Sequence, residues 1–267
     1  MSIDPTPGTD TDVLRSKAYA TPDKLGDRAA IYAYRTRTPD LHRWTTDLVD
    51  WPAGAAVLDL GCGPGRHLAR LGAVRPDLRL VGADLSEGML RTARTSEPRI
   101  RPVVADATRL PFASASFGGV MANHMLYHVA DQDAAVTEVR RVLDRDGAFV
   151  AVTNAVDHFA ELGELLIEAT GRRRARVSER FTTDTGGELL SRHFDEVVLH
   201  ELHDELVVPE VDPIVRYVRS TRDLSTSGAG DDQWERAVAA LERVASERLV
   251  ATGPIHLTVH TGAFVCR

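Results

Sequence analysis

The chain has 267 residues, 43% of them hydrophobic and 27% charged, which suffices for the core of one large domain. Its net charge of −7, with no long basic block, gives no electrostatic support for binding nucleic acid or anionic membranes. Two cysteines imply no disulfide framework, and the acidic N-terminal residues lack the apolar stretch of a signal peptide. We therefore expect a cytoplasmic protein without a membrane or nucleic acid as partner.

The first half of the chain has a regular alternation of predicted elements. Residues 1–16 cluster Pro, Thr, Asp and Gly and predict a disordered arm. Helical patterns follow over 22–36 and 39–50. Strands are then expected at 55–60, 78–85, 100–106, 118–124 and 148–154, and helices at 65–73, 86–96 and 131–147, the last closed by Gly147. This alternation predicts an α/β fold, a parallel sheet with helices on both faces.

The rhythm changes after Asn154. The pattern predicts helices near 157–171, 183–194 and 233–249, and strands at 196–208 and 255–266. The segments 155–182 and 208–232 are interpreted as insertions that decorate the sheet, so residues 17–267 form a single domain.

The stretch "VLDLGCGPGRHLARL", residues 57–71, places Gly61, Gly63 and Gly65 between a predicted strand and a helix. A glycine turn at the carboxyl end of a parallel strand lets a ligand approach the backbone closely. The dinucleotide fingerprint is G-x-G-x-x-G, whereas the spacing here is G-x-G-x-G. Asp84 ends the second strand, where a carboxylate accepts hydrogen bonds from ribose hydroxyls, and Asp106 ends the third. Asp59 lies under the turn.

These motifs, with "VGADLSEGML" and "VVADATRLPFASASFGGVMANHMLYHV", closely resemble the class I S-adenosylmethionine (SAM)-dependent methyltransferases, in particular the branch acting on small molecules. The resemblance covers about residues 55–155. It implies a seven-stranded, Rossmann-like sheet whose last strand is antiparallel. It also implies SAM as cofactor, S-adenosylhomocysteine as product, and no metal.

The resemblance carries cofactor roles onto particular residues. It implies that the three glycines surround the methionine tail of SAM, with Asp84 on the ribose. The remaining cofactor-binding residues are expected to be Asp59, Cys62, Leu85, Met89, Asp106, Ala107 and Asn123. Three simpler interpretations stay open: Asp84 as a helix cap, Asp106 as a turn residue, and Cys62 as a small apolar filler.

Candidates for chemistry follow the fourth strand in "NHMLYHV". His124 and His128 are the candidate catalytic bases, because an imidazole titrates near neutral pH, and Tyr127 is a candidate substrate contact. A structural role for His128 is the alternative. A base is needed only where the accepting atom carries a proton that must leave early.

The segment "YATPDKLGDR", residues 19–28, resembles an element that closes over the cofactor in this branch, so residues 17–50 are predicted to form a helical lid. Tyr19 is a candidate substrate contact and Arg28 a partner for the tail carboxylate, with a solvated helix as the alternative. "RRRAR", residues 172–176, is either an anion-binding patch or a solvated face. His200 and His203 lack the H-E-x-x-H spacing, so we expect no metal there.

The predicted function is transfer of a methyl group from SAM to an O, N or C nucleophile of a small molecule, in biosynthetic or secondary metabolism. Two alternatives stay open: a non-catalytic SAM-binding regulatory module and a nucleotide-dependent oxidoreductase. The oligomeric state and the identity of the acceptor are not predictable from the residues.

Overall fold

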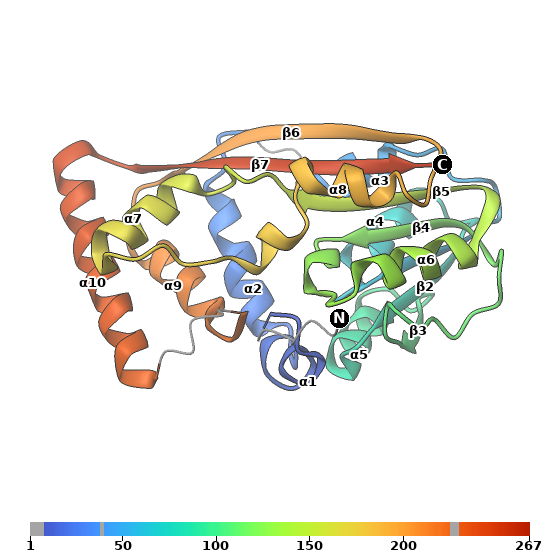
Figure 1. Cartoon of the computed structure of the whole chain (residues 1–267), viewed down its shortest axis with the longest axis horizontal. Helices are drawn as coiled ribbons and strands as arrows, with labels where there is room; N and C mark the ends of the chain where they lie inside the picture. The colour runs from blue at the N-terminus through green and yellow to red at the C-terminus, as the bar shows by residue number, and fades with distance from the viewer. Residues whose placement is uncertain (1–7, 38–39, 225–229) are drawn as a thin grey trace.

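Seven strands form one sheet in the computed structural model, which describes residues 8–37, 40–224 and 230–267 (Figure 1). The strand order is β3-β2-β1-β4-β5-β7-β6, and β7 alone runs antiparallel to the other six strands. This confirms the predicted mostly parallel seven-stranded sheet with an antiparallel last strand. The strands are β1 (Ala56–Leu60), β2 (Arg79–Asp84), β3 (Arg101–Val104), β4 (Phe117–Asn123), β5 (Leu143–Asn154), β6 (Val197–Val208) and β7 (Ile255–Cys266).

Helices cover both faces of the sheet, as the alternating pattern predicted. All five residues of β1 are buried, as expected of a central strand covered on both sides. One apolar cluster joins the sheet to α6 and α8, and a second joins it to α4 and α5. The helices of this body are α3 (Leu41–Asp47), α4 (Arg66–Val74), α5 (Glu87–Ser96), η3 (Leu126–His128), α6 (Gln132–Val142), η4 (Val177–Arg180) and α8 (Thr183–Leu190).

A third apolar cluster lies at the far end of β6 and β7, at the left of Figure 1. Helices α7, α9 and α10 pack there around Trp234, Val238 and Leu241, which lie on the predicted apolar face of α10. The elements of this end and of the N-terminal segment are α1 (Thr11–Val13), η1 (Leu14–Ala18), α2 (Asp23–Ala30), η2 (Ile31–Tyr34), α7 (Ala160–Thr170), α9 (Asp212–Ser220), η5 (Arg222–Leu224) and α10 (Asp231–Thr252).

Two expectations about boundaries are wrong. The helix predicted to run to Gly147 ends at Val142, because Leu143 turns extended and pairs with Phe117 at the start of β5. The predicted arm over 1–16 is helical from Thr11 onwards, where Asp10 caps α1 and Leu14 is buried. Apolar contacts of Leu14 and Ala18 with Leu224 hold this part in place. Residues 1–7 lie outside the described range.

Segments 155–182 and 208–232 contribute α7 and α9 to the third cluster, η4, which contacts η3, and η5, which contacts η1. Residues 225–229 of the second segment lie outside the described chain. Among the described residues, no helix combines the length and apolar character that crossing a membrane requires.

Candidate functional site

The glycine turn between β1 and α4 has left-handed backbone at each glycine, with φ of +65° at Gly61, +52° at Gly63 and +77° at Gly65. The three positions need glycine for different reasons. A Cβ on Gly63 would lie 3.8 Å from Leu25 and otherwise meet open space. A Cβ on Gly61 would come within 2.7 Å of Met125, and one on Gly65 within 2.9 Å of Ala93 and Ile100. Gly63 therefore offers bare backbone to a ligand, whereas Gly65 allows the start of α4 to pack on α5 and on Ile100, which precedes β3.

Asp84 connects this turn to the start of α5. Its carboxylate accepts hydrogen bonds from the backbone N–H of Gly63, at 2.9 Å, and of Ser86, at 2.8 Å. Ser86 is the cap of α5, since its hydroxyl accepts from the Met89 N–H. Burial raises the pKa of Asp84, and the backbone donors of Ser86 and Gly63 act in the opposite direction. Asp84 is therefore not simply a helix cap, because its carboxylate also binds the backbone of the glycine turn.

Asp59 and Asn123 form a buried pair at the ends of β1 and β4. The Asn123 side-chain amide donates to one oxygen of Asp59 at 3.0 Å. The other oxygen of Asp59 and the side-chain oxygen of Asn123 are buried without a hydrogen-bond partner in the described chain. Burial raises the pKa of Asp59 to about 7, while the Asn123 hydrogen bond lowers it. Two acceptor atoms thus stand ready for a donor group of a ligand.

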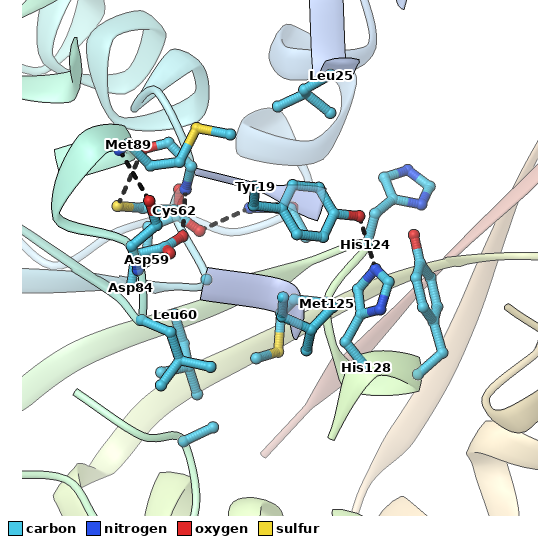
Figure 2. A pocket seen from close by; sticks show the side chains of 18 of the residues that line it. Tyr19, Leu25, Asp59, Leu60, Cys62, Asp84, Met89, His124, Met125 and His128 are labelled. Carbon is cyan, nitrogen blue, oxygen red and sulfur yellow. Dashed lines mark hydrogen bonds between the residues drawn. The ribbon is translucent and has the colours of Figure 1, made fainter. Parts of the chain in front are cut away.

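A cavity of about 800 Å³ opens above these residues (Figure 2). Among the predicted cofactor, catalytic and substrate residues, Gly65 alone is absent from its walls. The residues that line it are Tyr19, Arg28, Asp59, Gly61, Cys62, Gly63, Asp84, Leu85, Met89, Asp106, Ala107, Asn123, His124, Tyr127 and His128. The topology therefore gathers into one cavity the positions that sequence reasoning singled out.

Comparison with known proteins identifies what kind of site this is. A family model described as "Methyltransferase domain" matches residues 58–151, which run from β1 into β5. A trans-aconitate 2-methyltransferase from Azoarcus sp. is 31% identical over 173 residues, covering 62% of this chain and 68% of that enzyme. The chain belongs to the class I SAM-dependent methyltransferases.

Two further relatives show how far the likeness extends. A malonyl-[acyl-carrier protein] O-methyltransferase from Legionella pneumophila is 34% identical over 147 residues, which are 54% of this chain and 51% of that enzyme. The chain therefore matches about half the length of that relative. A phosphoethanolamine N-methyltransferase 2 from Haemonchus contortus, solved with SAM, superposes with a TM-score of 0.58 at 18% identity, over 96% of this chain and 59% of that one. This last likeness concerns the fold alone.

The methyltransferase has residues that suit SAM. The ligand carries an ammonium and a carboxylate on its tail, a ribose diol and an adenine. The unpartnered oxygen of Asp59 suits a donor such as the ammonium, and the bare backbone at Gly63 suits close approach of the tail. Family membership decides against the nucleotide-dependent oxidoreductase, and the non-catalytic SAM-binding module stays an alternative.

His128 holds the N-terminal segment of the methyltransferase in place. One ring nitrogen lies 2.8 Å from the Gly8 carbonyl oxygen and the other 2.8 Å from the Tyr19 hydroxyl. The carbonyl only accepts, so Nδ1 donates to it and Nε2 accepts from the hydroxyl of Tyr19. Burial lowers the pKa of His128 to about 4, which fits a neutral ring. These contacts favour the structural role over the catalytic one for His128.

His124 lies in a group of histidines on the cavity wall with His42 and His67. The His42 and His67 rings are 4.5 Å apart between centroids. Burial lowers the pKa of His124 to about 4, and the charges of His42 and Arg35 act in the same direction. His124 also has left-handed backbone, with φ of +53°. The imidazole is therefore neutral near pH 7 but a weak base.

Arg28 lies between the main cavity and a second cavity of about 400 Å³. One of its nitrogens donates to the Ser220 carbonyl at 2.8 Å, its guanidinium lies over the Tyr19 ring, and Nη2 is buried without a partner in the described chain. Tyr19, Tyr127 and His128 line both cavities. The second cavity is otherwise bordered mainly by 155–182 and by residues 217–224 of the second insertion. Pairing of Arg28 with the tail carboxylate stays a prediction.

The arginine run borders this second cavity but is largely engaged with the protein. Arg176 donates to the backbone carbonyls of His158 and Val156. Arg174 donates to Thr221 and lies over the Trp234 ring, and burial lowers its pKa to about 10. These two residues are not part of a solvated face.

Sequence reasoning missed several wall residues. Leu14 fell in the segment predicted to be disordered, Leu25 lies in the predicted lid segment without being singled out, and Tyr32 and His42 carry no local motif. His67 lies two residues after Gly65, in the first turn of α4. This position was the one sequence signal that could have placed His67 at the site. His42 reaches the site through packing of α3 on α4, which no local pattern encodes.

Proposed function

We propose that this methyltransferase transfers the methyl group of SAM to an oxygen, nitrogen or carbon nucleophile of a small molecule, in biosynthetic or secondary metabolism. The observation that carries the proposal is the single cavity that holds the SAM-type residues together with His124 and Tyr127. Its volume of about 800 Å³ lies in the usual range for small-ligand sites. The name of the Legionella relative specifies oxygen as the accepting atom, and that of the Azoarcus relative specifies trans-aconitate.

SAM supplies a methyl group activated on a sulfonium. The chain's own contribution is to bind and orient. Gly61, Gly63 and Asp59 would hold the tail, Asp84 the ribose, and Leu85, Met89, Asp106 and Ala107 the adenine. The N-terminal segment would exclude water, since Leu14, Tyr19 and Leu25 all line the cavity. Alignment of two bound reactants contributes roughly 7–11 kcal/mol to lowering a barrier when the geometry is good.

A neutral His124 with a pKa near 4 fits an acceptor that is already nucleophilic, such as a carboxylate or an amine. His124 would then donate its ring N–H to a carboxylate, or accept a hydrogen bond from an amine, and so position the acceptor. We expect no metal to be required for the transfer.

The test uses SAM with an isotopically labelled methyl group and panels of carboxylic acids, phenols and amines, with mass-spectrometric detection of products. Calorimetry runs alongside, with SAM, S-adenosylhomocysteine and NAD as ligands. We expect SAM and its product to bind in the micromolar range, NAD not to bind, and label to appear on a small molecule. Transfer to bulk RNA or protein, with none to any small acceptor, would contradict the proposal.

His124→Ala reports the chemistry of the acceptor. If the nucleophile needs no base, we expect the variant to lose less than tenfold in kcat and to have a higher KM for the acceptor. Its affinity for SAM should be unchanged. We also expect kcat of the wild type to show no histidine step between pH 6 and 8, because His124 stays uncharged there. A kcat loss of about 10²–10⁴-fold would instead assign proton removal to His124.

A further inference from the structure

A glutamate and two histidines meet on the outermost strands of the sheet, and none of them lines either cavity. Glu201 and His203 belong to β6 and His260 to β7. The strands are antiparallel, with His203 directly opposite His260 and Glu201 two residues along the same face. One potential ligand atom from each of the three lies within 4.8 Å of the others. A separation of 57 residues in the sequence hides this group from motif searches.

Asp157 orients the central histidine. Its carboxylate lies 2.8 Å from Nδ1 of His260, and Glu201 lies 2.8 Å from Nε2. A carboxylate on one ring nitrogen of a histidine is the usual partner of a metal ligand, because it fixes the tautomer and leaves the other nitrogen for the ion. His203 flanks the same ring, with centroids 4.0 Å apart.

We propose that Glu201, His203 and His260 bind a zinc ion, with Asp157 as the residue that orients His260. Two imidazoles and one carboxylate are a ligand set typical of Zn²⁺, and a water molecule would complete a tetrahedron. Ligands about 2.0–2.1 Å from a tetrahedral ion lie about 3.3 Å apart, so the His260–Glu201 contact must open by about half an ångström. The two carboxylates supply the negative charge that balances a dication.

The surroundings of the group allow metal entry and suggest a structural role. Glu201 and His203 are exposed, while the His260 side chain is only 13% exposed and so provides a fixed anchor. His260 is also bound through its backbone to the segment after β5, by the Ala155 N–H and by Nδ1 of His158. Within the described chain, Asp157 and Glu201 both form an ion pair with His260. A bound ion would join the edge strand β6 to β7 and to this segment.

The experiment uses the full chain, freed of any histidine tag and treated with a chelator. Titration with zinc chloride is followed by calorimetry and by thermal unfolding, and cobalt(II) serves as a visible-spectrum probe of tetrahedral coordination. We expect one ion per chain, a rise in Tm on zinc addition, and a tetrahedral cobalt spectrum. We expect Glu201→Gln and His203→Ala to weaken binding by about tenfold or more, and Asp157→Asn by about 10–100-fold.

His256→Ala is the matched control, because His256 is an exposed histidine of β7 paired with one carboxylate, Glu205, on the same face. We expect it to leave zinc binding unchanged. Thermal unfolding of the metal-free Glu201→Gln variant checks that it folds. This substitution conserves the shape of an exposed side chain. The proposal is overturned by absence of saturable binding, or by binding that responds to His256→Ala and not to His203→Ala. Neither result bears on methyl transfer.

Discussion

Asp84 holds the glycine turn against the start of α5, so its removal tests the cofactor end of the cavity directly. We expect Asp84→Asn to raise the Kd for SAM tenfold or more, because losing a charged acceptor costs about 1.5–3 kcal/mol. Calorimetry measures this, with Asp77→Asn as the control, since Asp77 accepts from Gly54 and Arg75 at the surface. An unchanged Kd would restrict Asp84 to holding the turn.

We expect Asp59 to make SAM binding depend on pH. Its pKa of about 7 in the free protein means that the carboxyl is largely protonated at pH 6, whereas the ammonium of SAM requires the carboxylate. SAM affinity should therefore fall as pH drops from 7.5 to 5.5. Asp59→Asn should remove this slope and weaken binding at pH 7.5. Calorimetry at several pH values on both proteins checks it, and equal slopes would rule out Asp59 as the titrating group.

At the residue scale, the meeting of the glycine turn and Asp84 in one cavity was predictable, because these residues lie in short contiguous motifs at strand ends. Gly61, Gly63 and Asp84 are placed by the local geometry of a strand and a turn. Gly65 shows the limit of this reasoning, since the turn requires its backbone conformation but its neighbours are Ala93 and Ile100 rather than the cavity. The histidine group was not predictable, because His42 and His124 meet only through tertiary packing.

At the element scale, η3 and the N-terminal segment act as partners through His128. Acid should weaken this contact. The folded pKa of about 4 lies below the usual value of 6.5, so the opened state binds more protons between these values. The stability that the contact contributes is full above pH 6.5 and is lost as pH falls towards 4.

Hydrogen exchange measures this directly. We expect the amides of residues 10–19, corrected for intrinsic rates, to open more readily at pH 5 than at pH 7. Tyr19→Phe keeps the ring beneath Arg28 but removes the hydrogen bond to His128. It should lower the free energy of opening at pH 7 by about 1 kcal/mol. His193→Ala, at a surface histidine paired with Asp133, is the control. The same protection at both pH values would contradict this role of His128.

Most elements were predictable to within a few residues, because strand and helix periods differ clearly in this chain. The end of α6 was not. Arg140–Leu143 continue an apolar period that suits a helix, but the carbonyls of Arg141 and Val142 accept from Ala115 and Ser116 as the chain turns into β5. A long-range pairing decided the boundary there.

At the scale of the whole molecule, the third apolar cluster, around α7, α9 and α10, is separate from the two clusters that pack α4, α5, α6 and α8 against the sheet. Leu241 of α10 is fully buried in it. Leu241→Ala should lower the free energy of unfolding by about 2–5 kcal/mol. The Kd for SAM should stay within threefold, because no residue of this cluster belongs to the glycine turn. Denaturant unfolding and calorimetry measure the two quantities, and a parallel loss of SAM binding would show that the clusters are coupled.

The N-terminal segment over the cavity has a consequence for how the protein is made. Its anchors lie far along the chain: Tyr19 contacts His128 at a separation of 109 residues, and Arg28 contacts Ser220 at a separation of 192. Both anchors are synthesised after the segment that they hold. Closing loops of this length costs conformational entropy, and many contacts of long range slow folding. During synthesis the glycine turn therefore exists before Ser220 does, and until Ser220 is made this anchor cannot hold the segment over the cavity.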